Sequence, residues 1–159
     1  RATYEAHGVL RQGERNVVVR PGTRIAGLPR HTLKLGADWR VADGWSVGGD
    51  LQAVSGRGIA GNEDGVVEDE GDERVDVGLP GYAVVNVRAS WRPRGGGDAA
   101  GWEVFARVGN LFDRRYETFG ALAETVFDPT GTSTVPARDA VFVAPGAPRS
   151  VFVGVRWRH

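Results

Sequence analysis

The sequence contains no cysteine and no methionine, and Lys34 is its only lysine. Without cysteine the chain has no disulfide framework, no thiolate metal site and no cysteine nucleophile. No apolar run approaches the roughly 18 residues that a transmembrane helix requires, which excludes a helical membrane span. The 20 basic and 20 acidic residues give a net charge of zero, so the overall charge provides no attraction to nucleic acid.

The composition that remains is typical of a folded protein rather than a disordered one, with 41% hydrophobic and 25% charged residues. Glycine is abundant, at 24 of 159 residues. The first ten residues, "RATYEAHGVL", resemble neither a signal peptide nor the remnant of its cleavage site. We therefore expect residues 1–159 to be the C-terminal portion of a longer protein.

Apolar and polar residues alternate with a period of two along five segments, which predicts β-strands. In residues 31–41, for example, Leu33, Leu35 and Trp39 fall on one face. Each segment lasts about 9–11 residues, the length that a tilted strand needs to cross a bilayer. The five segments are 31–41, 45–55, 82–92, 102–112 and 149–159, and a weaker strand within 1–10 makes six.

The connections between these segments are of two kinds. Residues 42–44 and 93–101 form short or Gly-rich turns, whereas 12–29, 55–81 and 120–148 are long polar loops. Outer-membrane barrels have this asymmetry, with short periplasmic turns and longer extracellular loops. The sequence therefore predicts an all-β fold, a transmembrane antiparallel β-barrel.

The five tryptophans all fall at the end of the strands that carries the short turns. An indole is favoured at headgroup depth, because its ring is apolar while its N–H stays hydrated. We therefore predict a membrane-interface belt; the alternative, the core of a soluble sandwich, gives no reason for this sorting. The belt residues are Trp39, Trp45, Trp91, Trp102 and Trp157.

The polar residues of the same strands are expected to face a lumen, because a sheet in lipid must close to pair its backbone groups. Both signs of charge occur there, and we interpret most of them as salt bridges rather than a dedicated anion path. About eight strands are needed to enclose side chains, so six strands require others upstream. The expected lumenal residues are Lys34, Asp38, Arg40, Asp50, Asn86, Arg88, Arg92, Glu103, Arg107 and Arg156.

Four segments resemble, in order and spacing, the last strands of TonB-dependent outer-membrane receptors of the siderophore-uptake type. They are "GLPRHTLKLGADW", "LPGYAVVNVRASW", "FARVGNLFDRRYETFG" and "APGAPRSVFVGVRW", and they cover nearly the whole chain apart from loop interiors. The most specific element is Asn110-Leu111-Phe112-Asp113 followed by Tyr116. The resemblance implies that the chain supplies about six C-terminal strands of a larger barrel, of the 22-stranded type with a plugged lumen.

The resemblance also implies a function and a set of partners. Receptors of this family import scarce ligands, mostly ferric siderophores and sometimes cobalamin or sugars, with energy delivered by an inner-membrane TonB complex. The expected partners are outer-membrane lipid, a siderophore-type ligand, the plug domain and upstream barrel strands, and the TonB complex through the N-terminal region. The plug is absent from this chain. The expected location is the Gram-negative outer membrane, with the C-terminus periplasmic.

The strand from Trp102 to about Phe112 is expected to cross the membrane outward, and "DRRYETFG" is expected to continue the same strand above the outer surface, where apolar alternation is no longer needed. Tyr116 and Phe119 then mark the outer interface or the rim of a ligand vestibule, and Arg115 is a further candidate for ligand contact. Salt bridges between strands are the preferred interpretation of Asp113, Arg114 and Arg115. The family usually ends on an aromatic residue that the membrane-insertion machinery recognises, whereas this chain ends on His159. The resemblance therefore implies less efficient assembly.

No constellation predicts catalysis, a cofactor or a metal site, so we do not expect an enzyme. The histidines His7, His31 and His159 lack metal-ligand spacing, no serine lies in a nucleophile elbow, and the Gly-rich stretches do not follow the phosphate-loop pattern. The acidic stretch 63–76 could offer carboxylates to a calcium ion, but it matches no EF-hand spacing, and a solvated loop is the preferred interpretation.

Two other classes of outer-membrane protein stay open. A passive or substrate-specific diffusion channel, similar to a porin, would share the strands, belt and loops but lack a plug. An outer-membrane enzyme or secretion barrel would be expected to carry a Ser/His/Asp arrangement in its lumen or loops. Only the sequence upstream of this chain separates the first of these from a receptor.

Overall fold

The computed structural model describes residues 2–12, 15–61, 66–68, 74–76, 78–93, 101–125 and 138–157. These residues divide into two compact units, which we describe separately. One unit, the sheet unit, comprises His31–Val54, Tyr82–Arg115 and Gly146–His159; the other, the hairpin unit, comprises Arg1–Arg30, Ser55–Gly81 and Tyr116–Pro145. Among the described residues no helix is long and apolar enough to cross a membrane.

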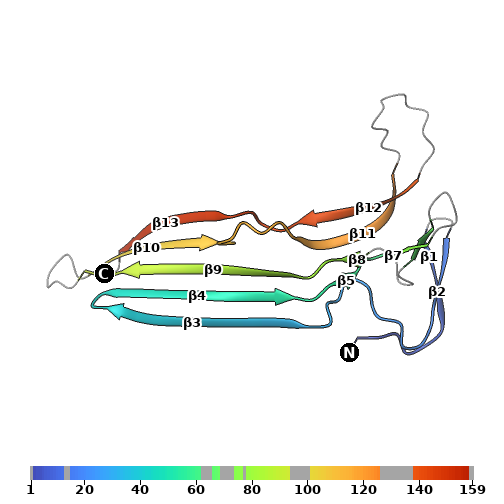
Figure 1. Ribbon diagram of the computed structural model, residues 1–159, viewed down its shortest axis with the longest axis horizontal. Helices are drawn as coiled ribbons and strands as arrows, with labels where there is room; N and C mark the ends of the chain where they lie inside the picture. The colour runs from blue at the N-terminus through green and yellow to red at the C-terminus, as the bar shows by residue number, and fades with distance from the viewer. Residues whose placement is uncertain are drawn as a thin grey trace, which may run out of the picture. The chain divides into compact units, whose positions relative to one another are not determined.

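The sheet unit is a single antiparallel sheet of five long strands (Figure 1). Along the chain they are β3 (Thr32–Ala42), β4 (Trp45–Val54), β9 (Tyr82–Trp91), β10 (Trp102–Gly109) and β13 (Ser150–Trp157). Their order in the sheet is β13-β10-β9-β4-β3, so that β13 and β3 form its two edges. The five strands correspond to the five strongly alternating segments of the sequence, which confirms the prediction of an all-β antiparallel fold.

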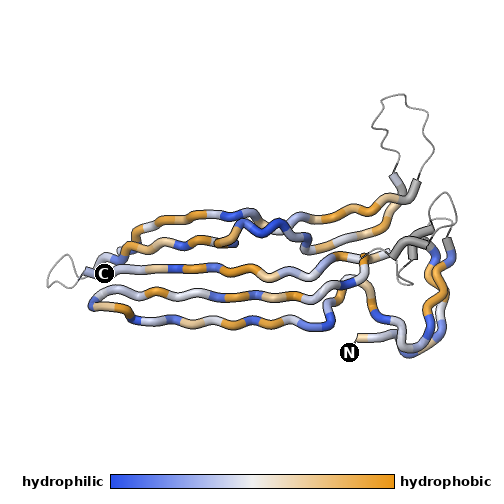
Figure 2. Tube along the Cα trace, viewed as in Figure 1, coloured by the Kyte–Doolittle hydropathy of each residue, from blue (hydrophilic) through white to orange (hydrophobic). Residues whose placement is uncertain are grey.

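The pairing register places residues of like polarity side by side across all five strands. One row across the sheet consists of Trp39, Val47, Ala89, Ala106 and Val153. The next row, displaced by one residue, consists of Asp38, Gly48, Arg88, Arg107 and Phe152. Because successive side chains of a strand point to opposite faces, the first row lies on an apolar face and the second on a charged face. Figure 2 shows this alternation along β3 and β4.

The apolar face of the sheet has no covering layer among the described residues of the sheet unit. Its large side chains are exposed on edge strands, where Trp39 is exposed by 73% and Val153 by 65%, and also on the central strand β4, where Val47 is exposed by 41%. A soluble sheet normally buries such a face against a second layer, because exposed apolar surface is unfavourable in water. The described residues of the sheet unit therefore leave one face of the sheet apolar and exposed.

The hairpin unit consists of short antiparallel pairs. Strand β1 (Gly8–Gln12) pairs with β2 (Arg15–Val19), and β11 (Glu117–Thr125) pairs with β12 (Arg138–Pro145). The other described pairings of this unit are two shorter strand pairs and two isolated bridges. The pairs are β5 (Arg57–Gly58) with β8 (Gly78–Leu79) and β6 (Val66–Glu68) with β7 (Arg74–Asp76), and the bridges are Thr3–Arg24 and Ala60–Ala121. Its buried apolar residues are Val17, Val19, Ile59 and Leu79.

Two sequence-based expectations differ from this structure. Segments 12–29, 55–81 and 120–148, expected to be polar loops, contain strands or parts of strands, because hairpins pair their own backbone groups and need little apolar alternation. The weak strand expected within 1–10 does not extend the five-stranded sheet. The chain there forms β1, which pairs with β2 in the hairpin unit. The acidic stretch 63–76 lies largely outside the described residues, apart from the backbone of β6 and β7.

Gly120 allows close packing inside the hairpin unit. A Cβ atom at this position would lie 2.7 Å from Cγ2 of Ile59 and 3.1 Å from Cδ2 of Leu79. The two neighbours are among the most buried residues of the chain, so they have little room to move. Residue 120 is therefore restricted to glycine by its neighbours and not by its backbone conformation.

We predict that Gly120→Ala destabilises this unit by about 1–3 kcal/mol, the usual cost of overpacking a tight site. The measurement is hydrogen exchange of the amides of Ala60 and Leu122, whose hydrogen bonds join the bridge to β11. Gly58→Ala is the matched control, because a Cβ at that position meets no atom within 4 Å. Equal exchange rates in the two variants would contradict the prediction.

Candidate functional site: the charged face of the sheet

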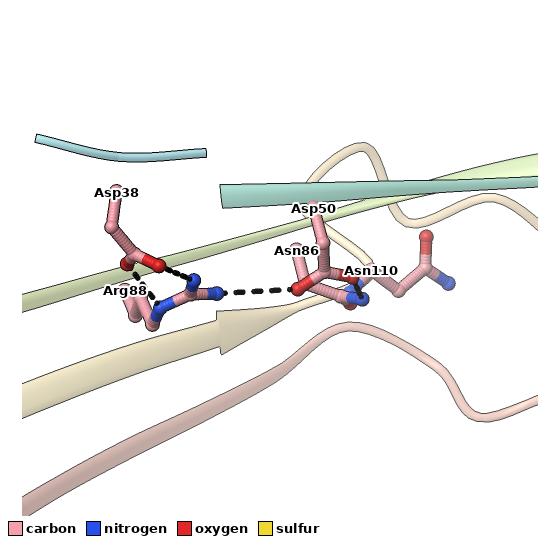
Figure 3. A network of polar contacts seen from close by, with 5 residues as sticks. All are labelled: Asp38, Asp50, Asn86, Arg88 and Asn110. Atoms are coloured by element: carbon pink, nitrogen blue, oxygen red, sulfur yellow. Dashed lines mark hydrogen bonds and ion pairs between the residues drawn. The ribbon is translucent and has the colours of Figure 1, made fainter. Parts of the chain in front are cut away.

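An ion pair between Asp38 and Arg88 crosses the middle of the charged face. Nε and Nη2 of Arg88 donate to Oδ1 and Oδ2 of Asp38 at 2.9 and 2.6 Å, which is a bidentate geometry (Figure 3). The two residues belong to β9 and β3, which are separated by β4, and the residue of β4 between them is Gly48. A Cβ at Gly48 would collide with both side chains, so this glycine provides the gap through which the pair forms.

The network continues from Arg88 toward the end of β10. Nη1 of Arg88 lies 3.5 Å from Oδ1 of Asp50, and Nδ2 of Asn86 donates to the other oxygen of Asp50 at 2.7 Å. Oδ1 of Asn86 accepts from the backbone N–H of Asn110 at 2.9 Å. Hydrogen bonds and ion pairs thus connect four side chains that the sequence placed on one face: Asp38, Asp50, Asn86 and Arg88. The network reaches Asn110, the first residue of the "NLFD" motif (Figure 3).

The prediction of one continuous strand from Trp102 to about Phe112 and on through "DRRYETFG" is wrong for residues 110–116. Strand β10 ends at Gly109, and the next strand, β11, begins at Glu117. Asn110 and Asp113 both adopt positive φ, at 50° and 51°, and the N–H of Asp113 donates to the carbonyl of Asn110 at 2.9 Å. Asn and Asp tolerate this left-handed conformation better than other non-glycine residues, which explains their presence in the motif.

The side chain of Asn110 holds this turn together. It is 3% exposed, and its Nδ2 donates to the carbonyls of Arg114 and Ala147 at 2.9 and 3.0 Å, while its Oδ1 accepts from the N–H of Arg114 at 2.8 Å. Asp113 accepts from the N–H of Arg149 at 2.9 Å, so its carboxylate binds backbone rather than forming the expected salt bridge. One amide and one carboxylate therefore join residues 110–114 to residues 147–149.

A second group of charges surrounds Glu103. Its two carboxylate oxygens lie 3.3 Å from Nη2 of Arg92 and 3.4 Å from Nη1 of Arg156, and the side chain is mostly buried. The guanidinium of Arg156 also lies over the ring of Phe105, 5.5 Å from its centroid. Phe105 covers Gly154 of the neighbouring strand, where a Cβ would lie 2.6 Å from the ring.

The sequence analysis interpreted the charged residues of the polar face mainly as salt bridges. In β9 and β10, Arg88 and Glu103 form such salt bridges, and Arg107 is the exception. Arg107 of β10 has no ion pair or hydrogen bond from its side chain within the described part of the chain. It is exposed and lines two hollows of the charged face. The sequence does not indicate that Arg107 lacks a partner, because its neighbours are set by the pairing of β10 with β9 and β13.

The five tryptophans lie at one end of the five-stranded sheet and are all exposed. Trp45 is directly opposite Trp91, with ring centroids 6.1 Å apart, and Trp102 is opposite Trp157, at 6.2 Å. Trp39 lies near the end of β3, on the same face as Val47. The register thus places an aromatic row beside the connection between β3 and β4.

The candidate ligand-contact residues are divided between the two units. Arg115 is exposed and belongs to the sheet unit, whereas Tyr116 is half-buried and Phe119 is exposed in β11 of the hairpin unit. Beside Phe119, a β-bulge interrupts the pairing of β11. Arg57, which the sequence did not indicate, donates to the carbonyls of Glu117 and Thr118 at the bulge, at 3.1 and 2.6 Å.

Neither a metal site nor a catalytic arrangement is formed by the residues that we can describe. No group of three His, Asp or Glu residues among them is arranged to hold a metal ion. The described histidines, His7 and His31, are both exposed, and His159 lies outside the described residues. Among the described residues, the charged face carries the network of ion pairs and hydrogen bonds that runs from Asp38 to Asn110.

Comparison with solved structures finds the same fold within much longer chains. The siderophore receptor PiuA from Acinetobacter baumannii matches with a TM-score of 0.64 at 13% identity, covering 94% of this chain and 17% of that one. The ferric citrate transporter FecA, in the unliganded form, matches with a TM-score of 0.55 at 18% identity, covering 86% of this chain and 18% of that one. FpvA of P. aeruginosa, bound to heterologous pyoverdines, gives the same TM-score and identity, covering 86% and 15%.

The chain therefore spans less than a fifth of the length of these solved structures. A search of curated protein sequences finds no match. The model of one protein family, described as "TonB dependent receptor-like, beta-barrel", matches residues 2–111, which is more than half of the chain. The chain belongs to the family of TonB-dependent receptors, and its antiparallel sheet is part of the β-barrel of that family.

Proposed function

We propose that this chain forms the C-terminal strands of the barrel of an outer-membrane receptor, which imports a ferric siderophore or a similarly scarce ligand with energy from the TonB complex. The observation that carries the proposal is the two-faced sheet, with an uncovered apolar face and a charged face joined by ion pairs. Family membership and the fold shared with solved receptors support it.

In this proposal the apolar face contacts lipid and the charged face lines the lumen. Strands β3 and β13 are the edges of the described sheet, and their unpaired backbone groups would be very unfavourable in hydrocarbon. Further strands must therefore pair with both edges to close the barrel. We infer that upstream residues of the same receptor supply these strands and the plug domain that fills the lumen.

The aromatic row supports a proposal for the orientation of the strands in the membrane. We propose that Trp39, Trp45, Trp91, Trp102 and Trp157 lie at the periplasmic interface of the membrane, since they are exposed beside the short connection of β3 and β4. Short turns are periplasmic in barrels of this kind. Because β13 ends at Trp157, the same orientation places the C-terminus in the periplasm.

The ligand is inferred from the class of protein and not from a pocket of this chain. Two of the structurally similar proteins are called a siderophore receptor and a ferric citrate transporter, and a third was solved with pyoverdines. We propose a ferric chelate as the ligand, with Arg115, Tyr116 and Phe119 as candidate contacts on the extracellular side. None of them belongs to the charged network of the sheet.

Transport tests the proposed function directly. We expect a strain that expresses the full receptor to take up ferric siderophore labelled with radioactive iron, and inactivation of TonB to abolish this uptake. The control is the same strain with the receptor gene deleted. Uptake of small solutes that continues without TonB would instead indicate a diffusion channel, and the absence of any uptake, across a panel of iron chelates, would contradict iron import.

The depth of the tryptophans tests the orientation. Lipids brominated at different acyl positions should quench Trp39, Trp45, Trp91, Trp102 and Trp157 most strongly near the headgroups, at one common depth, because an indole is favoured there. Variants of the receptor that retain one of these tryptophans at a time allow each depth to be measured. Quenching maxima near the bilayer centre would exclude the proposed belt.

A matched pair of arginine substitutions on β13 distinguishes the two faces. Val153 and Phe152 are exposed to a similar extent, 65% and 61%, but lie on the apolar and the charged face respectively. We expect Val153→Arg to destabilise the folded receptor in vesicles, reducing its free energy of unfolding by about 2–4 kcal/mol, as for arginine facing lipid near mid-depth. The cost of Phe152→Arg should not depend on depth, because the lumen is polar.

Alanine variants at the same two positions separate the loss of the native side chain from the cost of placing a charge. The quantity to compare is the difference between the arginine and the alanine variant at each position, measured by urea titration in vesicles. Equal differences at residues 152 and 153 would mean that the two faces have the same environment. The assignment of one face to lipid would then be wrong.

A further inference from the structure

Three of the four arginines on the charged face of β9, β10 and β13 are paired with acidic residues of the same face. Arg88 is bound by Asp38 and Asp50, and Arg92 and Arg156 share Glu103. Arg107 is the fourth, and its side chain has no anionic partner among the described residues. Arg107 is therefore the exception among these arginines, while Arg40 and Lys34 of the edge strand β3 also have no ion pair among the described residues.

The register makes the lack of a partner unfavourable at this position. Arg107 lies directly opposite Arg88 on one side, and like charges in direct cross-strand contact repel each other. On its other side it lies opposite Phe152, which offers no charge. Both carboxylates that bind Arg88 come from β3 and β4, on the side away from β10, so neither compensates Arg107.

Two hollows of the charged face meet at this arginine. One, of about 240 Å³, is lined by residues that include Phe105, Arg156 and the carboxylates Asp38 and Glu103; the other, of about 440 Å³, is lined by residues that include Ser150, Phe152 and Asp50. The three carboxylates are already paired with Arg88, Arg92 or Arg156. Arg88 and Arg107 line both hollows. A group that occupies either hollow therefore approaches the unpaired guanidinium.

Aromatic surface lies beside the same guanidinium. The rings of Phe105 and Phe152 are 5.9 Å apart, centroid to centroid, and Phe152 is 61% exposed even though it belongs to the charged face. Exposed phenylalanine on a polar face is unfavourable unless an apolar group covers it. The surface around Arg107 thus combines a guanidinium that has no anionic partner among the described residues with an exposed aromatic side chain, Phe152.

We propose that Arg107, with Phe105 and Phe152, forms a subsite for a carboxylate attached to an apolar or aromatic group. The guanidinium binds the carboxylate in the planar, two-hydrogen-bond geometry that Arg88 already forms with Asp38, and the rings contact the apolar part of the same group. The inference rests on the proposed function only in assuming that this face is turned toward a lumen. It concerns a site on the barrel wall, apart from the candidate contacts Arg115, Tyr116 and Phe119.

The carboxylate has two possible sources with the same chemistry. It belongs either to a free organic acid in the lumen or to an acidic side chain of a polypeptide segment that lies over this face. A zero-length coupling reaction separates them. A carbodiimide joins a lysine amine to a carboxylate in direct contact with it, and mass spectrometry identifies the residue that has been joined.

The experiment uses the full receptor carrying Arg107→Lys, treated with carbodiimide in the presence of phenylacetate. Phenylacetate provides both a carboxylate and a ring. The matched control is Arg40→Lys on β3, which is exposed on the same face but lies opposite Ser46 rather than an aromatic residue. Lys34, the natural lysine of this face, serves as a reference within each sample.

We expect coupling at position 107 to exceed that at position 40 by about fivefold or more, a ratio within the range of one charge-assisted hydrogen-bonded pair. A phenylacetyl adduct in excess of that at position 40 shows that the subsite takes a free organic acid, and an amide bond to an acidic residue of another segment identifies a polypeptide. Equal coupling at positions 107 and 40 would overturn the inference. So would an amide bond to Asp38 or Asp50, because Arg107 would then have its partner within the sheet.

The unmodified receptor gives a second measurement that does not depend on the folding of a variant. Phenylglyoxal, which reacts with accessible guanidinium groups, should modify Arg107 more slowly than Arg40, either throughout or once phenylacetate is added. Identical rates under both conditions would also overturn the inference. Uptake of iron is measured on the same strains, so that a failed subsite with intact uptake is distinguished from a failure of the proposed function.

Discussion

The strict alternation of side chains in a paired β-sheet is the constraint on which this structure depends. Each strand must satisfy its backbone through its neighbours, and that pairing leaves the side chains free to define two unlike faces. A shift of one residue in the register of any strand would transfer its apolar set to the charged face. The rows through Trp39 and Asp38 show that all five strands keep one register, and the ion pairs across β4 depend on it.

The charged face is organised by small residues as much as by charged ones. Gly48 leaves the space in which Asp38 and Arg88 meet, and Gly154 leaves the space that Phe105 covers. A strand that carried larger side chains at these positions would keep its hydrogen bonds but separate the charges. Glycine weakens a strand interior, so its presence at these two positions reflects the contacts made above it. The number of glycines, 24, does not show which of them lie beneath such contacts, so composition alone gave no indication of the network.

The sequence was sufficient for the parts of the fold that repeat. Period-two alternation located all five long strands, and it separated the residues of the charged face, including Asp38, Asp50, Asn86 and Arg88. It was insufficient where structure depends on contacts between distant residues. Strand β5 and its partner β8 have two residues each, too few for a period to be recognised. Asn110 was noticed as part of a motif, but its role rests on hydrogen bonds to Asn86 and Ala147, which no local pattern reveals.

The hydrogen bonds of Asn110 have a consequence for how the chain tolerates change. The side chain of Asn110 binds the carbonyls of Arg114 and Ala147, and the carboxylate of Asp113 binds the N–H of Arg149. The two ends of the segment 115–146 are therefore held close together. The entropic cost of closing such a segment grows only slowly, by about 0.6 kcal/mol for each doubling of its length. Closure entropy therefore places little restriction on the length of the excursion between these two points, and the restriction at Gly120 comes instead from its contacts with Ile59 and Leu79.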